Sequence, residues 1–125
     1  MKKILIVDDE EAILHTLSRA IRGKDLEVLT ASTMVEAEYA INNSSLDLVL
    51  ADIRLTGMLG REGLELLQYV KERSPETHVI IMTGYGSPEI EKEALDRGAA
   101  FYFEKPIDLK TLMQRLRELS LPVEC

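Results

Sequence analysis

The stretch ILIVDDEE, residues 4–11, joins four consecutive apolar side chains to four consecutive acidic ones. A short and wholly apolar run is typical of a strand that is covered on both faces of a sheet. The acidic run marks the point where this strand ends and the chain turns into an amphipathic segment. The junction decides the fold, because comparable junctions return along the rest of the chain.

Four further apolar runs follow the first, and amphipathic segments separate them. Their sequences are LEVL, LVLA, VIIM and AFYF, at residues 26–29, 48–51, 79–82 and 100–103. The first of these four alternates apolar and polar residues, which indicates a strand at the edge of the sheet. Five strand–helix units predict an α/β fold, a single-domain doubly wound parallel sheet of five strands with five helices on both faces.

The segments between the apolar runs contain apolar residues at helical spacing and residues that are typical of helix N-termini. They are Ile13, Leu14, Leu17 and Ile21; Thr33 with Glu36; Leu64, Leu67 and Val70; Ser87 with Pro88; and Leu109, Leu112, Met113, Leu116 and Leu119. Gly23 is predicted to be a left-handed C-cap of the first helix, and Gly98 to end the fourth. We expect one domain over residues 1–121 and a short tail over residues 122–125.

The amino-acid composition narrows the range of possible functions. The 125 residues include 15 basic and 22 acidic ones, a formal net charge of −7, which argues against broad nucleic-acid binding. Cys125 is the only cysteine, so an internal disulfide is impossible. No apolar run approaches the roughly 20 residues that span a bilayer, and the first apolar run is too short for a signal peptide. We expect a cytoplasmic protein without a membrane segment.

Polar residues follow the strands at the edge where such sheets bind ligands. Asp8 and Asp9 follow the first run, Asp52 the third, Thr83 the fourth and Lys105 the fifth. Three adjacent carboxylates repel one another unless a cation holds them, and oxygen-only ligands favour Mg²⁺. The lysine and the hydroxyl suit an anionic oxygen. The set therefore predicts a site in which a carboxylate accepts a phosphoryl group.

Each of these residues also has a plainer interpretation. The acidic run can begin a helix through capping and the helix dipole, Asp52 can belong to a turn, and Lys105 can be a solvated strand exit. Thr83 with Gly84 can be an ordinary loop. To account for all of these residues, the plainer interpretations must hold independently at four different strand ends.

Four segments carry a family resemblance that covers essentially the whole chain. They are ILIVDDE (4–10), LVLADIR (48–54), MTGYG (82–86) and GAAFYFEKP (98–106), which resemble the landmark segments of receiver domains of two-component response regulators. The resemblance implies the flavodoxin-like strand order 2-1-3-4-5. It also implies that Asp52 is the phosphoacceptor and that Asp8 and Asp9 form the acidic pocket for Mg²⁺.

The resemblance implies further roles. Asp9 and Asp52 bind the metal directly, together with the backbone carbonyl of Arg54. Thr83 is the switch hydroxyl, whereas Tyr102 is the switch aromatic residue.

Lys105 is by the same resemblance the cation that pairs with the phosphate, and the peptide bond between Lys105 and Pro106 is expected to be cis. The chain departs from the family pattern where Thr56 replaces a proline and the next helix starts about three residues late. We expect residues 55–62 to form a loop with a short insertion. Arg54 and Tyr85 resemble positions that tune the lifetime of the acyl phosphate, and their bulk predicts slow hydrolysis.

The resemblance implies a signalling switch that catalyses its own phosphorylation and dephosphorylation and is no metabolic enzyme. A histidine kinase or phosphotransfer protein supplies the phosphoryl group. The surface of the fourth helix, fifth strand and fifth helix then changes its preference for an output domain or a second copy. The MTGYG segment favours an output in transcription. This domain itself is not expected to bind nucleic acid.

Three alternatives are open at this stage. A receiver can act as a phosphorylation-independent docking module. A phosphohydrolase with an aspartyl nucleophile would carry a second aspartate where Arg54 stands. A flavin carrier would need a glycine- and hydroxyl-rich phosphate loop after the first strand, where this chain is acidic.

Overall fold

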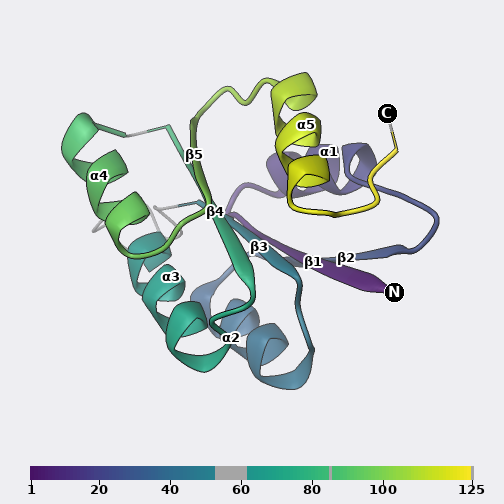
Figure 1. Cartoon of the computed structure of the whole chain (residues 1–125), viewed down its shortest axis with the longest axis horizontal. Coiled ribbons are helices and arrows are strands. Elements are labelled where there is room, and N and C mark those ends of the chain that lie inside the picture. The colour runs from purple at the N-terminus through teal and green to yellow at the C-terminus, as the bar shows by residue number, and fades with distance from the viewer. Residues whose placement is uncertain (53–61, 85, 125) are drawn as a thin grey trace.

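The computed structural model describes residues 1–52, 62–84 and 86–124 of the chain, and within them it has five strands and five helices (Figure 1). The strands are β1 (Lys2–Val7), β2 (Leu26–Ala31), β3 (Leu48–Asp52), β4 (His78–Thr83) and β5 (Phe101–Glu104). The helices are α1 (Glu11–Ala20), α2 (Met34–Asn43), α3 (Glu62–Arg73), α4 (Pro88–Asp96) and α5 (Leu109–Glu118). The strands pair in parallel in the order β2-β1-β3-β4-β5, which confirms the predicted fold and strand order.

The helices cover both faces of the sheet, α1 and α5 on one face and α2, α3 and α4 on the other (Figure 1). Alternate residues of each central strand serve the two faces. In β1, Ile4 and Ile6 pack toward α1 and α5, whereas Leu5 and Val7 pack toward the other helices. Two separate hydrophobic clusters therefore fix the sheet in the middle of the domain.

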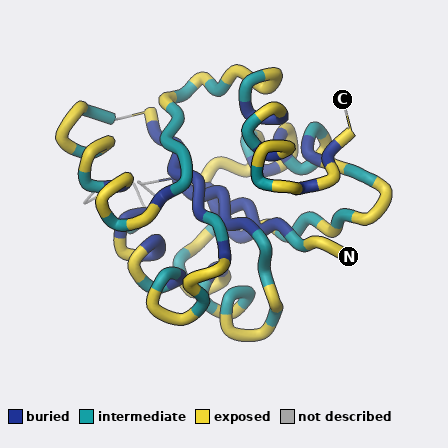
Figure 2. Tube along the Cα trace, in the orientation of Figure 1, coloured by how far each residue is buried: buried dark blue, intermediate teal, exposed yellow. Residues whose placement is uncertain are grey.

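Burial distinguishes the central strands from the edges (Figure 2). All five residues of β3 are buried, Asp52 included, whereas β2 has a single buried residue, Ala31. The alternating pattern that predicted an edge strand at residues 26–29 is confirmed. Because the central strands are apolar up to their last residues, the polar groups gather at the carboxyl ends of the strands.

Local capping agrees with most of the sequence pattern. The Thr33 hydroxyl accepts a hydrogen bond from the Glu36 N–H at 3.1 Å, as a capping box requires. The Glu36 carboxylate accepts instead from the N–H of Ser32 at 2.8 Å, one residue earlier than the motif predicts. Ser87 caps α4 by accepting from the N–H of Ile90, and Gly98 follows that helix with φ at 107°.

The prediction for Gly23 is wrong. Helix α1 ends at Ala20 with an extended residue, Ile21, as its C-cap, and the positive-φ glycine of the described chain is Gly98. Gly23 is needed for a different reason, because a Cβ there would collide with the carbonyl oxygen of Pro122. The close approach of two backbones, and not a left-handed turn, requires glycine at this position.

The approach belongs to a contact made by residues 120–124, which we call the C-terminal clasp. Ser120 turns the chain with φ at 67°, and the N–H of Leu121 donates to the carbonyl of Leu116 at 3.0 Å. Leu121 and Val123 are buried in the cluster under α1 and α5, and the N–H of Glu124 donates to the carbonyl of Arg22 at 2.8 Å. The clasp thus joins the end of α5 to the turn between α1 and β2.

None of the helices within residues 1–52, 62–84 and 86–124 is long and apolar enough to cross a membrane.

Candidate functional site

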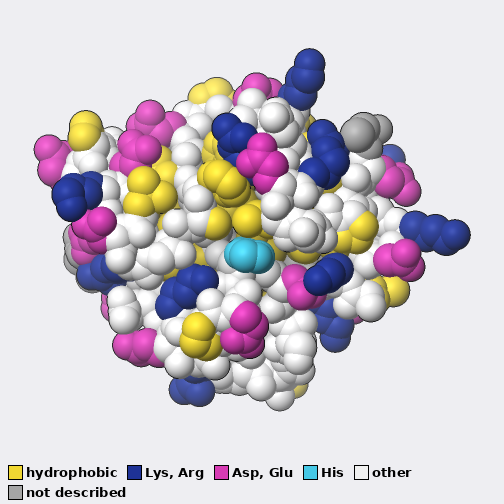
Figure 3. Space-filling model, in the orientation of Figure 1, with side chains coloured by type: hydrophobic (Ala, Val, Ile, Leu, Met, Phe, Trp, Pro, Cys, Tyr) yellow, Lys and Arg dark blue, Asp and Glu magenta, His cyan; other side chains and the backbone are white. Residues whose placement is uncertain are grey.

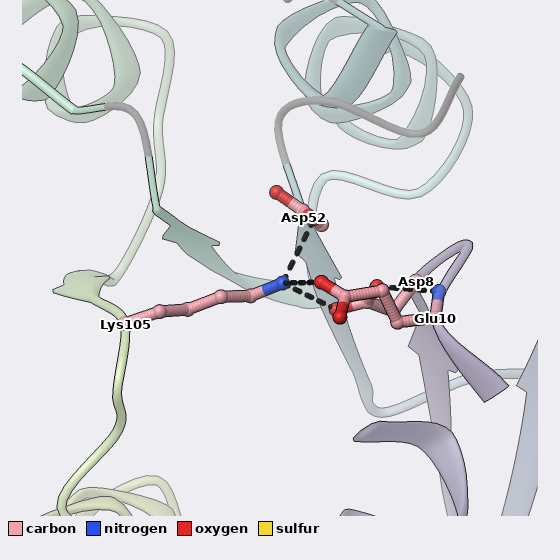
Figure 4. Close-up of polar contacts among 4 residues, drawn as sticks. All are labelled: Asp8, Glu10, Asp52 and Lys105. Atoms are coloured by element: carbon pink, nitrogen blue, oxygen red, sulfur yellow. Dashed lines mark hydrogen bonds and ion pairs between the residues drawn. The ribbon is translucent and has the colours of Figure 1, made fainter. Parts of the chain in front are cut away.

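The carboxyl edge of the sheet brings together three charged residues that lie far apart in the sequence. Asp8 follows β1, Asp52 is the last residue of β3, and Lys105 follows β5. The Lys105 ammonium donates to Asp8 Oδ2 at 2.8 Å and to Asp52 Oδ2 at 2.9 Å (Figure 4). Both carboxylates are buried, so the ammonium supplies the charge that offsets them.

Backbone hydrogen bonds hold these groups in place. The N–H of Asp8 donates to the carbonyl of Ala31 at 3.1 Å, and Asp8 Oδ1 accepts from the N–H of Glu10 at 2.9 Å. The N–H of Lys105 donates to the carbonyl of Thr83 at 2.8 Å, and the Thr83 residue is completely buried. The structure therefore places Thr83 directly beside the start of the Lys105 loop.

An acidic group adjoins the lysine. Carboxylate oxygens of Asp8, Asp9 and Glu10 all lie within 4.8 Å of one another. Glu10 is the N-cap residue of α1, but its side chain makes no capping hydrogen bond; Glu10 Oε1 lies 3.6 Å from Lys105 Nζ instead. Plain helix capping therefore does not account for Glu10. We did not assign Glu10 to the site from the sequence, and its place in the acidic run was the available signal.

The electrostatics of the site favour a further cation. Four carboxylates, those of Asp8, Asp9, Glu10 and Asp52, face one ammonium. Burial raises the pKa of the Asp9 carboxyl, and the neighbouring Asp8 adds to the rise. Burial alone would lower the pKa of Lys105, but its hydrogen bonds to Asp8 and Asp52 outweigh that effect and raise it. This donor set of carboxylate oxygens fits a hard ion such as Mg²⁺.

Tyr102 lies apart from this charged group. It is half-buried on β5 opposite Ile81 and packs against the cluster covered by α2, α3 and α4. Its hydroxyl occupies the space that a side chain on Gly86 would need, and it has no hydrogen-bond partner of normal geometry among the described residues. Burial raises the pKa of Tyr102, Glu104 adds to the rise, and the nearby N–H of Ser87 opposes it only weakly.

Other predicted site residues have mixed outcomes. The peptide bond between Lys105 and Pro106 is cis. Arg54 and Tyr85 lie outside the described residues, as do Thr56 and residues 55–61 of the predicted loop. Glu62, the last residue assigned to that loop, is instead the first residue of α3.

An apolar groove adjoins the lysine between α1 and the loop that leads into α5. Its volume is about 490 Å³. The lining residues are Ala12, Ile13, Thr16, Leu17, Lys105, Pro106, Ile107 and Leu109. Lys105 belongs both to the groove and to the charged group, so the groove adjoins the site through this lysine.

The family description "response regulator receiver domain" matches residues 4–117, nearly the whole chain. The chain belongs to the response regulator receiver family.

Curated relatives of this receiver are much longer proteins. It is 38% identical over 118 residues to the response regulator protein PilR of Pseudomonas aeruginosa, covering 94% of the receiver and 25% of PilR. It is 36% identical over 106 residues to the DNA-binding transcriptional regulator NtrC of Escherichia coli K12, covering 85% of the receiver and 22% of NtrC. The receiver thus spans about a quarter of the length of these homologous regulators.

Solved structures give the same relationship. A CheY-like receiver domain protein from Methanospirillum hungatei is 36% identical, with a TM-score of 0.86 and coverage of 96% of this receiver and 94% of that chain. The beryllofluoride-activated NtrC4 receiver domain dimer is 31% identical, with a TM-score of 0.84 and coverage of 95% and 96%. Two of the sequence-derived alternatives, an aspartyl phosphohydrolase and a flavin carrier, are not favoured by these relationships.

Proposed function

We propose that this receiver accepts a phosphoryl group on Asp52 from the phosphohistidine of a histidine kinase or phosphotransfer protein. The observation that carries the proposal is the contact of one ammonium, that of Lys105, with two buried carboxylates at the carboxyl edge of the sheet. Such an arrangement holds a nucleophilic carboxylate beside a fixed positive charge. The result is a signalling switch, whose chemistry is confined to its own phosphorylation and dephosphorylation.

The transfer itself needs little covalent chemistry from the protein. An oxygen of the Asp52 carboxylate forms the new bond to phosphorus as the bond from the donor imidazole nitrogen breaks, and that nitrogen keeps the electron pair. The carboxylates of Asp8, Asp9 and Asp52 and the carbonyl of Arg54 would hold Mg²⁺, and the ion would offset negative charge on the phosphoryl oxygens. Lys105 pairs with one of these oxygens, and the Thr83 hydroxyl donates to another.

Phosphorylation changes the packing behind the site. The added charge attracts Thr83 and Lys105, which vacates space next to β5. The Tyr102 ring is suited to respond, because its hydroxyl is buried without a hydrogen bond of normal geometry and gains one by turning. The surface formed by α4, β5 and α5 then shifts between two packings, and its partner preference shifts with it.

Three kinds of partner follow from this function. The apolar groove beside Lys105 suits an amphipathic helix of the phosphodonor, because a helix seated there presents its phosphohistidine to Asp52. The output partner is a transcription-regulating domain, since the homologous regulators include the DNA-binding regulator NtrC. A second copy of the receiver is a further partner through the surface of α4, β5 and α5.

Arg54 and Tyr85 are proposed to shield the acyl phosphate from water.

The deciding experiment is intact mass after incubation with Mg²⁺ and acetyl phosphate. We expect the wild type to gain the mass of one phosphoryl group, Asp52→Asn to gain none, and the exposed Asp96→Asn variant to behave as wild type. Omission of the metal should prevent the gain. If Asp52→Asn is labelled as well as the wild type, the assignment of the phosphoacceptor is wrong.

Absence of labelling in the wild type would call for a beryllofluoride binding measurement. Binding would mean that acetyl phosphate does not serve as a donor, and the proposed chemistry would stand. Failure to bind would favour the phosphorylation-independent docking module instead.

A further inference from the structure

Lys105 contacts a third carboxylate whose role the phosphoacceptor chemistry leaves open. Glu10 Oε1 lies 3.6 Å from Lys105 Nζ, against 2.8 and 2.9 Å for Asp8 and Asp52. The three differ in burial, because the side chain of Glu10 is 63% exposed and those of Asp8 and Asp52 are 0% and 7% exposed. Figure 4 shows the Glu10 carboxylate on the same side of the lysine as Asp8.

The lysine and a divalent cation compete for the same oxygens. Lys105 already hydrogen-bonds Asp8 Oδ2 and Asp52 Oδ2, which belong to two of the three carboxylates proposed to hold Mg²⁺. Two cations a few Å apart repel strongly in a partly buried site. Metal binding therefore requires the ammonium to move away from at least part of its present contacts.

Glu10 is the contacting carboxylate that is free to follow this movement. Glu10 is the N-cap residue of α1 and lies at the rim of the site. Its side chain is exposed and makes no capping hydrogen bond. Asp8, in contrast, is fixed by its second oxygen, which accepts from the N–H of Glu10. An ammonium displaced toward the solvent meets Glu10 first, and its long stem gives it the reach.

We propose that Glu10 is a positioning residue that takes over the Lys105 ammonium when a divalent cation occupies Asp8 and Asp52. The inference rests on the metal site of the proposed function. It has two consequences. Glu10 offers the displaced ammonium a new carboxylate partner, which lowers the free energy needed to move Lys105 away from Asp8 and Asp52. Glu10 therefore strengthens metal binding indirectly. It also keeps the ammonium at the mouth of the site, where incoming phosphoryl oxygens need it.

The test is a double-mutant cycle on Mg²⁺ affinity, measured by titration calorimetry. The four proteins are the wild type, Glu10→Gln, Lys105→Met and the double variant. Glu10→Gln should weaken Mg²⁺ binding about threefold to tenfold more when Lys105 is present than in the Lys105→Met background. Glu11→Gln, which removes the same charge from the next residue of the acidic run, should weaken binding equally in both backgrounds.

The outcomes separate two failures. If the wild type shows no Mg²⁺ binding, the metal site of the proposed function is wrong. If the wild type binds Mg²⁺ but Glu10→Gln costs as much, or more, in the Lys105→Met background, only the role of Glu10 is overturned.

A second variant avoids any folding defect of Lys105→Met. Glu10→Asp keeps the charge but shortens the side chain by one methylene, so its carboxylate draws back from the ammonium. We expect Glu10→Asp to lose Mg²⁺ affinity relative to the wild type. Wild-type affinity in Glu10→Asp would overturn the proposal, because reach and not charge is the property that it assigns to Glu10.

Discussion

Lys105 offsets part of the negative charge of the site, because its ammonium lies close to two buried carboxylates and one exposed carboxylate. A buried carboxylate that loses its partner is costly, which makes this lysine a structural residue as well as a chemical one. Asp9 is placed differently. It is exposed at the rim, it adds to the negative charge of the group, and the described contacts give it no ammonium at ion-pair distance.

At the scale of this residue, we predict that Asp9→Asn stabilises the metal-free protein. Burial and the charge of Asp8 raise the pKa of Asp9, so the ionised form is disfavoured by folding and the penalty is fully present at neutral pH. Urea unfolding in EDTA should show a gain of roughly half a kcal/mol at pH 7, a size typical of exposed charge pairs.

The pH dependence of this effect has a defined sign. As the pH falls through the raised pKa of Asp9 toward its ordinary value, the folded protein takes up the proton first and the penalty disappears. The difference between Asp9→Asn and the wild type should therefore shrink in that window. Added Mg²⁺ should reverse the order and favour the wild type. A variant that is less stable than the wild type in EDTA at pH 7 would contradict this account.

At the scale of elements, sequence patterns predicted the strands well because each central strand is buried on both faces. The run VIIM marked β4 within a residue at each end, and LVLA marked β3 equally closely. A continuous apolar run can be recognised as a buried strand from the local sequence alone, without knowing which strands and helices lie beside it. Gly23 was misjudged because its partner, Pro122, lies at the other end of the sequence, and no local pattern announces that contact.

Gly23→Ala provides the corresponding prediction. The added methyl group meets the carbonyl oxygen of Pro122, which belongs to the backbone and moves only if the C-terminal clasp shifts. We expect a loss of about 1–3 kcal/mol in the free energy of unfolding, as for other overpacked positions. Gly84→Ala is the matched control, because among the described residues a Cβ at Gly84 meets nothing within 4 Å. Equal stability of the two variants, measured by urea unfolding, would mean that the clasp is not held as described.

At the scale of the whole molecule, the site is predictable in part because parallel strands deliver their ends to a common edge. From the sequence alone, that rule places Asp8, Asp52, Thr83 and Lys105 at one edge. It did not predict Glu10, whose contact depends on how far the lysine stem reaches across the edge. Strand order determines which residues lie at the same edge of the sheet, whereas the length and conformation of a flexible side chain determine which of them it contacts.

The edge of the sheet at β5 offers a surface of a different kind. Figure 3 shows hydrophobic side chains gathered between α4 and α5, over the edge strand β5, with charged side chains mostly around them. Phe101 and Phe103 of β5 are half-buried, and Arg115 of α5 lies over the Phe101 ring at 5.3 Å. Apolar surface with a charged rim is typical of protein interfaces.

We predict that activation makes this receiver dimerise. Beryllofluoride with Mg²⁺ should raise the mass measured by sedimentation from monomer toward dimer, because activation is proposed to change the packing of the surface of α4, β5 and α5. The related NtrC4 receiver is described as a beryllofluoride-activated dimer. Asp52→Asn should stay monomeric under the same conditions. A wild type that binds beryllofluoride and remains a monomer at high concentration would show that this surface serves another partner.

The charged group has one further consequence, for the order in which the chain is synthesised. Asp8 and Lys105 are 97 residues apart, and Asp52 lies near the middle. Translation produces both aspartates long before the lysine that contacts them. On the ribosome, a nascent chain therefore lacks the Lys105 contacts to these two carboxylates until β5 and the following loop have emerged. If Asp52 is the phosphoacceptor, as proposed, a nascent receiver cannot take up a signal before Lys105 has emerged, which is after four-fifths of this domain has been synthesised.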